Sequence, residues 1–352
     1  MPQTQTAPLP RLHRLPGLDA LRAYAALSVV VYHLPFNHRL GYLFLDGLDA
    51  VDLFFVISGF LITYLLLSER ARTGTVAIRA FYIRRGLRIL PLYYIALLIG
   101  TAATYLIGSR PLPPQIFLGY AVMAGQIAFV AYGFVPIIGV LWTISVEEWF
   151  YSVWCWVIRR QALGWISLAI IVLRIALTPL INDSDPLIAS VWGTLRFELL
   201  AIGALGAWLL LFCPGLVKIV TNPLCYAGAV LFMGALAFYD LPVQSYMAAV
   251  IHVVLIYNIF EQPLFLEAPL LRWIGERSYS IYIWHQVVMY GWRLLGVATN
   301  AIVPLTIIGT LLVAHVSYQV IETPFLQLKR RFATGQPHLD SDAISLVPKP
   351  ER

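Results

Sequence analysis

LPGLDALRAYAALSVVVYHL, residues Leu15 to Leu34, is an apolar run interrupted by ionisable side chains. At about 1.5 Å rise per residue, a helix of this length crosses the hydrocarbon core of a bilayer. Arg22 and His33 are eleven residues apart, close to three turns, so they should share one face about 16 Å apart. Asp19 lies one turn before Arg22 and is expected to pair with it. Because charges at membrane depth normally face a protein interior, this face is expected to line a site.

The composition predicts an all-α polytopic membrane protein. The 352 residues are 60% hydrophobic and 12% charged, with a mean hydropathy of +0.77, which excludes an ordinary soluble domain. The net charge of +6 is carried mostly by arginine in short loops, where it sets membrane orientation and gives no reason to expect nucleic-acid binding. The three cysteines lack metal-ligand spacing, so no metal is expected.

Apolar runs predict about ten transmembrane helices in a single bundle. Residues 1–14 are expected to be a flexible cytoplasmic leader, 15–325 the integral-membrane domain and 332–352 a disordered cytoplasmic tail. All basic clusters lie inside, with both termini cytoplasmic, if 116–132 is re-entrant or lies at the outer interface. The expected spans are 15–34, 51–67, 89–107, 141–158, 164–180, 195–212, 223–239, 244–260, 278–297 and 301–321.

A cluster of three arginines and a pair of glutamates are candidates for a functional site. Arg84, Arg85 and Arg88 fall at i, i+1 and i+4, so they project from one broad helix face. They could anchor the chain beside anionic lipid, or hold a phosphorylated donor, because arginine binds phosphate bidentately. Glu147 and Glu148 are adjacent within an apolar, aromatic-rich helix and diverge by about 100°. One of them is expected to face the interior and transfer protons, unless both meet water at the outer interface.

A polar stripe is predicted near the C-terminal end of the chain, because Ser278, Tyr282 and His285 occur at i, i+4 and i+7. His285 is either a hydrogen-bonded packing residue or part of a site. His33 is either an interfacial residue or a general base, the role that histidine fills near neutral pH.

Three more acidic or polar residues lie in apolar spans. Asp52 and Ser58 are six residues apart and do not share a helix face. Asp52, near the outer end, could pair with a base, and Ser58 beside Gly59 could permit close helix packing. Glu322 ends the last span near Lys329 and is expected to be structural.

Six stretches resemble the acyltransferase-3 family of integral-membrane O-acyltransferases, and the match covers about Leu15 to Phe325. Trp149 stands where the family more often has Gln, and Thr143 where it often has Ser. The resemblance implies a single-domain member without the periplasmic hydrolase-like domain of some relatives. In chain order the stretches are GLDALRAYAALSVVVYH, VDLFFVISGFLI, FYIRRGLRILPLYY, LWTISVEEWFY, SYSIYIWH and VIETPF.

The resemblance implies acyl transfer, commonly of acetyl, from cytoplasmic acyl-CoA to a hydroxyl of a carbohydrate or other acceptor. The implied location is a bacterial plasma (inner) membrane. The family's essential first-helix residues map onto Arg22 and His33, and its R-x-x-R motif maps onto Arg85 and Arg88. The arginine cluster would hold the CoA phosphates, and His33 would take the acceptor's proton or relay the acyl group, with one of the paired glutamates positioning it. Direct transfer and a covalent acyl-enzyme both remain open.

Two other functions use the same residues. A proton-coupled transporter could use the buried Glu, His and Arg groups as a relay, and it would need no cytoplasmic phosphate-binding cluster. A lipid-binding scaffold or sensor would tolerate the loss of His33.

Overall fold

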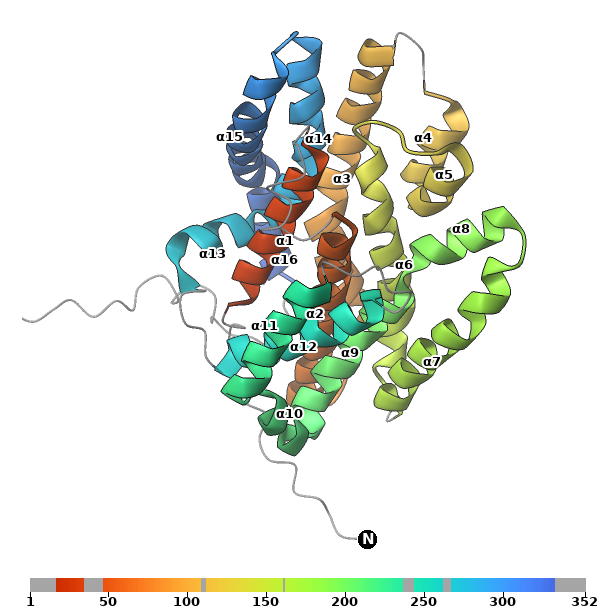
Figure 1. The fold of residues 1–352 in the computed structure, drawn as a ribbon, viewed down its shortest axis with the longest axis vertical. Coiled ribbons are helices and arrows are strands. Elements are labelled where there is room, and N and C mark those ends of the chain that lie inside the picture. Colours follow the sequence, from red (N-terminus) through yellow and green to blue (C-terminus); the bar gives the residue numbers. More distant parts are fainter. Residues whose placement is uncertain are drawn as a thin grey trace, which may run out of the picture.

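A computed structural model describes residues 17–34, 47–108, 112–160, 162–236, 244–261 and 267–332. The predicted leader, 1–14, and residues 333–352 of the predicted tail lie outside these ranges. The described residues form helices and contain no strand (Figure 1). The elements are α1 Leu18–His33, α2 Gly47–Thr73, α3 Ile78–Gly108, α4 Pro114–Ala121, α5 Gly125–Tyr132, η2 Gly139–Leu141, α6 Trp142–Val157, α7 Leu163–Asn182, α8 Pro186–Leu195, α9 Phe197–Phe212, α10 Pro214–Val220, α11 Pro223–Leu236, α12 Gln244–Glu261, α13 Pro269–Glu276, α14 Ser278–Leu294, α15 Thr299–Ser317, η4 Tyr318–Glu322 and α16 Thr323–Arg330.

The helices α1, α2, α3, α6 and α14 pack together at the centre of the molecule (Figure 1). α9 and α12 pack against α2, α13 packs against α1, and α15 packs against α14. α7 and α8 form a hairpin at one edge of Figure 1. The sequence therefore predicted the fold class correctly, because helices that are apolar on most faces can bury their backbone polar groups in a bilayer.

Five helical stretches of the described residues are long and apolar enough to cross a membrane. Several predicted spans form shorter helices: α1 and α6 each have 16 residues, or about 24 Å against a hydrocarbon core of about 30 Å. The count of ten spans therefore stays a prediction. The five stretches are Ala50–Thr73, Ile78–Leu106, Leu163–Asn182, Pro186–Phe212 and Ala301–Lys329.

The predicted third span forms part of a longer helix. α3 has 31 residues and begins at Ile78, so the arginine cluster belongs to the same helix as the apolar run. Pro91 lies inside α3. Proline removes one helical hydrogen bond and leaves a carbonyl group unpaired. In a membrane bundle, groups on neighbouring helices can hydrogen-bond to that carbonyl, so the proline is tolerated.

Residues 116–132 fold as two short helices, α4 and α5, of eight residues each. The chain turns between them at Met123, whose φ is 59°. Each helix is about 12 Å long, so neither can cross a bilayer, in line with the prediction that this segment does not fully cross. α8 lies between the spans predicted at 164–180 and 195–212 and reaches the first residue of the second.

Close contact between α2 and α9 depends on two glycines, as the sequence predicted for Gly59. A Cβ atom on Gly59 would lie 2.0 Å from the carbonyl oxygen of Leu200, and one on Gly203 would lie 2.1 Å from that of Val56. Both contacts are with backbone atoms, so the two helices would have to separate to admit a methyl group.

Gly203→Ala should therefore destabilise the protein by about 1–3 kcal/mol, measured as a lower melting temperature of the purified protein. Gly291→Ala is the matched control, because a Cβ atom there meets no atom within 4 Å. Equal melting temperatures for the two variants would contradict the close approach of α2 and α9.

Candidate functional site

A cavity of about 360 Å³ lies among α1, α2, α3, α6, α14 and α16. Leucine, isoleucine and phenylalanine side chains of α2 and α3 form much of its wall. Two acidic residues of the described chain, Glu69 and Glu147, also line it. Because the basic residues outnumber these two and much of the wall is apolar, the cavity favours an anionic ligand with an apolar part. The basic lining residues are Arg22, Arg72, Arg84, Arg85, Arg88 and Lys329.

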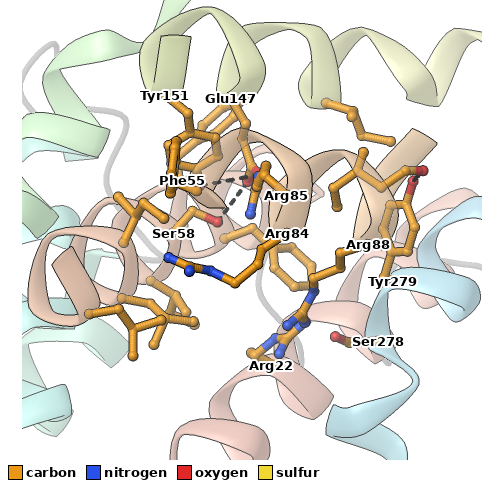
Figure 2. Close-up of a pocket in the computed structure, with 18 of the residues that line it drawn as sticks. Arg22, Phe55, Ser58, Arg84, Arg85, Arg88, Glu147, Tyr151, Ser278 and Tyr279 are labelled. Carbon is orange, nitrogen blue, oxygen red and sulfur yellow. Dashed lines mark hydrogen bonds and ion pairs between the residues drawn. The ribbon is translucent and has the colours of Figure 1, made fainter. Parts of the chain in front are cut away.

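Arg85 connects α3 to both glutamates of α6. Its Nε atom lies 2.8 Å from Oε1 of Glu148, and its Nη2 atom lies 3.1 Å from Oε2 of Glu147. Ser58 donates a hydrogen bond of 2.8 Å to Oε1 of Glu147 (Figure 2). The guanidinium also lies 3.9 Å from the centre of the Tyr151 ring. Two carboxylates thus compensate the single charge of Arg85, which leaves it poorly suited to bind a phosphate.

Of the two adjacent glutamates only Glu147 lines the cavity, in line with the prediction that one of them faces the interior, and Glu148 contacts Arg85 from beside it. Residues that diverge by about 100° on a helix can still reach one fork-shaped guanidinium placed between them. Both glutamates are therefore partners of Arg85, an arrangement that favours positioning over free proton exchange.

Arg84 is also engaged. Its Nη2 atom lies 2.7 Å from Oε2 of Glu69, and its Nη1 atom donates a hydrogen bond of 3.1 Å to the carbonyl oxygen of Phe332. The three arginines of the predicted cluster all line the cavity, but two of them are held by protein carboxylates. Arg88 is the member of the cluster that forms no hydrogen bond or salt bridge in the described part of the chain, and the anion-binding role of the cluster stays a prediction.

Arg22 of α1 and Arg88 of α3 bring their guanidinium groups close together at the edge of the cavity (Figure 2). Among the described residues, neither makes a hydrogen bond or an ion pair. Both also line a second cavity of about 180 Å³, so the pair separates the two spaces. The carboxylate of Glu322 interacts electrostatically with both guanidinium groups but forms no salt bridge with either among the described residues. Two guanidinium groups placed this close favour an anion such as phosphate between them.

Three acidic residues, Asp19, Glu276 and Glu322, line the second cavity. Asp19 and Arg22 both border this space, and the ion pair expected between them stays a prediction. Glu322 accepts a hydrogen bond from Ser280. Sequence reasoning assigned Glu322 a structural role and missed its position on the cavity beside the arginine pair. The wide η4 turn that carries it has no signal in the sequence pattern.

Two members of the predicted polar stripe, Ser278 and Tyr282, line the larger cavity. The hydroxyl groups of Tyr282 and Thr143 lie 2.8 Å apart, and that of Tyr282 also donates a hydrogen bond of 2.9 Å to the carbonyl oxygen of Val140. The Tyr282 ring is 6.0 Å from the ring of His285. The stripe therefore forms one wall of the site and ends at a histidine just behind it.

His33 lies beyond this wall. It lines neither cavity, but its ring is 5.0 Å from that of His285. Its Nδ1 atom is 2.9 Å from the carbonyl oxygen of Val29. Arg22 thus borders the cavity on the same helix that carries His33 about 16 Å away.

Asp52 is separate from the site. It is buried and pairs with Arg196 of the α8–α9 junction, which also donates a hydrogen bond of 3.2 Å to the hydroxyl of Ser245. The sequence suggested that Asp52 could pair with a base, and this is confirmed. Asp52 holds α2, α9 and α12 together and does not line either cavity. In the part of the chain that the structure describes, no group of His, Cys, Asp and Glu side chains is arranged to hold a metal ion.

A family model for the acyltransferase domain of the acyltransferase-3 type matches residues 15–318. This chain belongs to the acyltransferase-3 family. The resemblance seen in its sequence motifs is therefore confirmed over nearly the whole chain.

Two relatives illustrate the family. The chain is 28% identical to a Staphylococcus aureus (strain COL) protein named "Putative O-acetyltransferase", over 90% of this chain and 58% of the relative. It is 26% identical to the peptidoglycan O-acetyltransferase OatA of Listeria monocytogenes, over 88% of this chain and 55% of the relative. The chain thus spans little more than half the length of these acyltransferase-3 proteins. No solved structure matches it.

Proposed function

We propose that this chain is a membrane O-acyltransferase that moves an acyl group, most simply acetyl, from acyl-CoA to a hydroxyl group of a carbohydrate. Family membership supports acyl transfer. The name of the Listeria relative, a peptidoglycan O-acetyltransferase, supports a carbohydrate acceptor.

The observation that carries the proposal is the guanidinium pair of Arg22 and Arg88 at the edge of an otherwise largely apolar cavity. A donor with phosphates at one end and a long, weakly polar arm matches this arrangement, because the phosphates compensate the pair and the arm follows the apolar wall. Acyl-CoA has this construction. Arg84 and Arg85 support the site through their protein partners and add to its positive potential.

In the proposed reaction the acyl end of the donor extends toward Tyr282. The acceptor oxygen attacks the thioester carbon while His33 takes the hydroxyl proton as general base. The C–S bond then breaks, and the CoA thiolate recovers the proton. Glu147 and Glu148 act by fixing Arg85, and Ser278 and Tyr282 form the wall along which the donor lies.

The proposal includes the membrane orientation. The arginine-rich end of the cavity would face the cytoplasm, where acyl-CoA is available, and both termini would be cytoplasmic in a bundle of about ten spans. His33 would lie toward the opposite side of a bacterial inner membrane, where an extracytoplasmic acceptor can approach.

A proton-coupled transporter is the alternative, but no contact in the described residues favours it. Its expected relay carboxylates, Glu147 and Glu148, are both engaged by Arg85. A relay carboxylate must bind and release a proton in every cycle. A carboxylate held in an ion pair with arginine is stabilised in its ionised form and takes up a proton less readily.

The test uses purified protein in nanodiscs with radiolabelled acetyl-CoA, and it needs no acceptor. We expect saturable donor binding and slow release of free CoA thiol by hydrolysis. A folded protein that neither binds nor hydrolyses acetyl-CoA or longer acyl-CoA would refute the donor assignment. Proton flux in proteoliposomes would then test the transporter.

A further inference from the structure

Two histidines from distant parts of the chain lie next to each other at the end of the site. His33 closes α1 and His285 lies in the middle of α14, two helices that pack directly. Their ring centres are 5.0 Å apart and the ring planes are inclined by 52°. His285 is fully enclosed, with 1% of its surface exposed.

The backbone fixes the tautomer of both rings. Nδ1 of His33 lies 2.9 Å from the carbonyl oxygen of Val29, and Nδ1 of His285 lies 2.6 Å from that of Tyr282. A carbonyl oxygen can only accept, so both Nδ1 atoms must carry the hydrogen. In the neutral ring Nε2 then holds a lone pair and is the atom that can take a proton.

His285 has a second ring nitrogen that its contacts leave unused. Its Nε2 atom is buried and has no hydrogen-bond partner in the structure. Buried polar atoms are nearly always paired, so an unpaired acceptor beside a second imidazole needs an explanation. A proton shared with the neighbouring ring, directly after a small ring rotation or through one water, supplies it.

We propose that His285 is a positioning residue that shares the proton His33 removes from the acceptor hydroxyl. This inference rests on the proposed function. As a bond forms between the acceptor oxygen and the acyl carbon of the donor, the hydroxyl proton moves to Nε2 of His33. The resulting N–H of His33 donates to the Nε2 lone pair of His285, which spreads the positive charge over both rings. When the C–S bond breaks, the proton passes to the CoA thiolate, and both histidines return to the neutral state.

The variants separate proton sharing from packing. His285→Asn places an amide N–H where Nδ1 donates to Tyr282 but removes Nε2. His285→Gln can extend an amide toward His33, but an amide does not take up the proton. His252 is the matched control, because it is also buried with both ring nitrogens unpaired, and it lies on α12 away from both cavities.

The measurement is acceptor-dependent release of CoA by the full chain in nanodiscs, with ethanol and trifluoroethanol as acceptor probes. We expect His285→Asn and His285→Gln to lower kcat with ethanol about tenfold or more and to leave the Kd for acetyl-CoA unchanged. The loss should be smaller with trifluoroethanol, whose more acidic hydroxyl depends less on the base. His252→Asn should resemble the wild type with both acceptors.

The two proposals fail in different ways. If the wild type transfers acetyl to the alcohols and His285→Asn keeps its kcat, proton sharing is wrong and the acyltransferase function stands. If the wild type neither binds nor uses acyl-CoA, the function itself fails. Should both His285 variants misfold, 15N NMR of the wild type still decides: as the pH is lowered, the Nε2 signals of His33 and His285 should shift together because the two rings share one proton, and a shift of the His33 signal alone overturns the inference.

Discussion

His33→Ala is expected to lower acyl transfer by about 100- to 10,000-fold, the usual contribution of a general base, with little change in the affinity for acetyl-CoA. The reason is distance. His33 lines neither cavity, whereas Arg22, on the same helix, borders both. About 16 Å of helix separates the two residues, so removal of the imidazole leaves the anion-binding end of the site intact.

Two measurements on the same preparation check this prediction. The Kd for radiolabelled acetyl-CoA reports on donor binding at Arg22 and Arg88. The rate of CoA release at saturating acetyl-CoA reports on the catalytic step at His33. His252→Ala removes a buried histidine that is remote from the cavities and should transfer at the wild-type rate. If His33→Ala also retains transfer, His33 is a packing residue at the helix end, and the base must be sought elsewhere.

The second large effect is expected at the guanidinium pair. Arg22→Gln and Arg88→Gln should each weaken acetyl-CoA binding by about 10- to 100-fold, because a hydrogen bond to a charged group contributes about 1.5–3 kcal/mol and about 1.4 kcal/mol is tenfold in Kd. Glutamine keeps a donor but loses the charge. At saturating acetyl-CoA, kcat should change much less than Kd.

The best control changes the donor. Acetyl-pantetheine carries the same thioester without the phosphates, so the wild type and both variants should use it equally poorly. Arg79→Gln removes an exposed arginine of the same α3 helix that does not line the cavity, and it should leave binding unchanged. A loss with acetyl-pantetheine as large as that with acetyl-CoA would mean that the variants damage the bundle and not a phosphate site.

The sequence predicted the place of many helices because apolar character is a local property. The run predicted at 244–260 forms α12, Gln244–Glu261, and the run at 164–180 forms α7, Leu163–Asn182. The predicted boundaries are wrong where a polar stretch continues a helix. The first turns of α3 are basic, and the predicted span, 89–107, began only after them, whereas the helix begins at Ile78.

The site residues could be grouped by helix face but not by partner. Spacing along one helix predicted that Ser278 and Tyr282 share a wall, and both line the cavity. Contacts between helices leave no such signal. Nothing in the spacing of Glu147 shows that Arg85 compensates it, nor that Arg22 and Arg88, 66 positions apart in the chain, lie together at the edge of the cavity.

The η4 segment, Tyr318–Glu322, makes insertions and deletions more consequential than substitutions at this point of the chain. It is a π-helical turn between α15 and α16, which holds one residue more than an α-helical turn. Losing a single residue would let the two helices merge, and everything after the join would rotate by about 100°. Glu322 and Lys329 would leave their cavities together. The length of this segment, more than its chemistry, thus keeps both cavities lined.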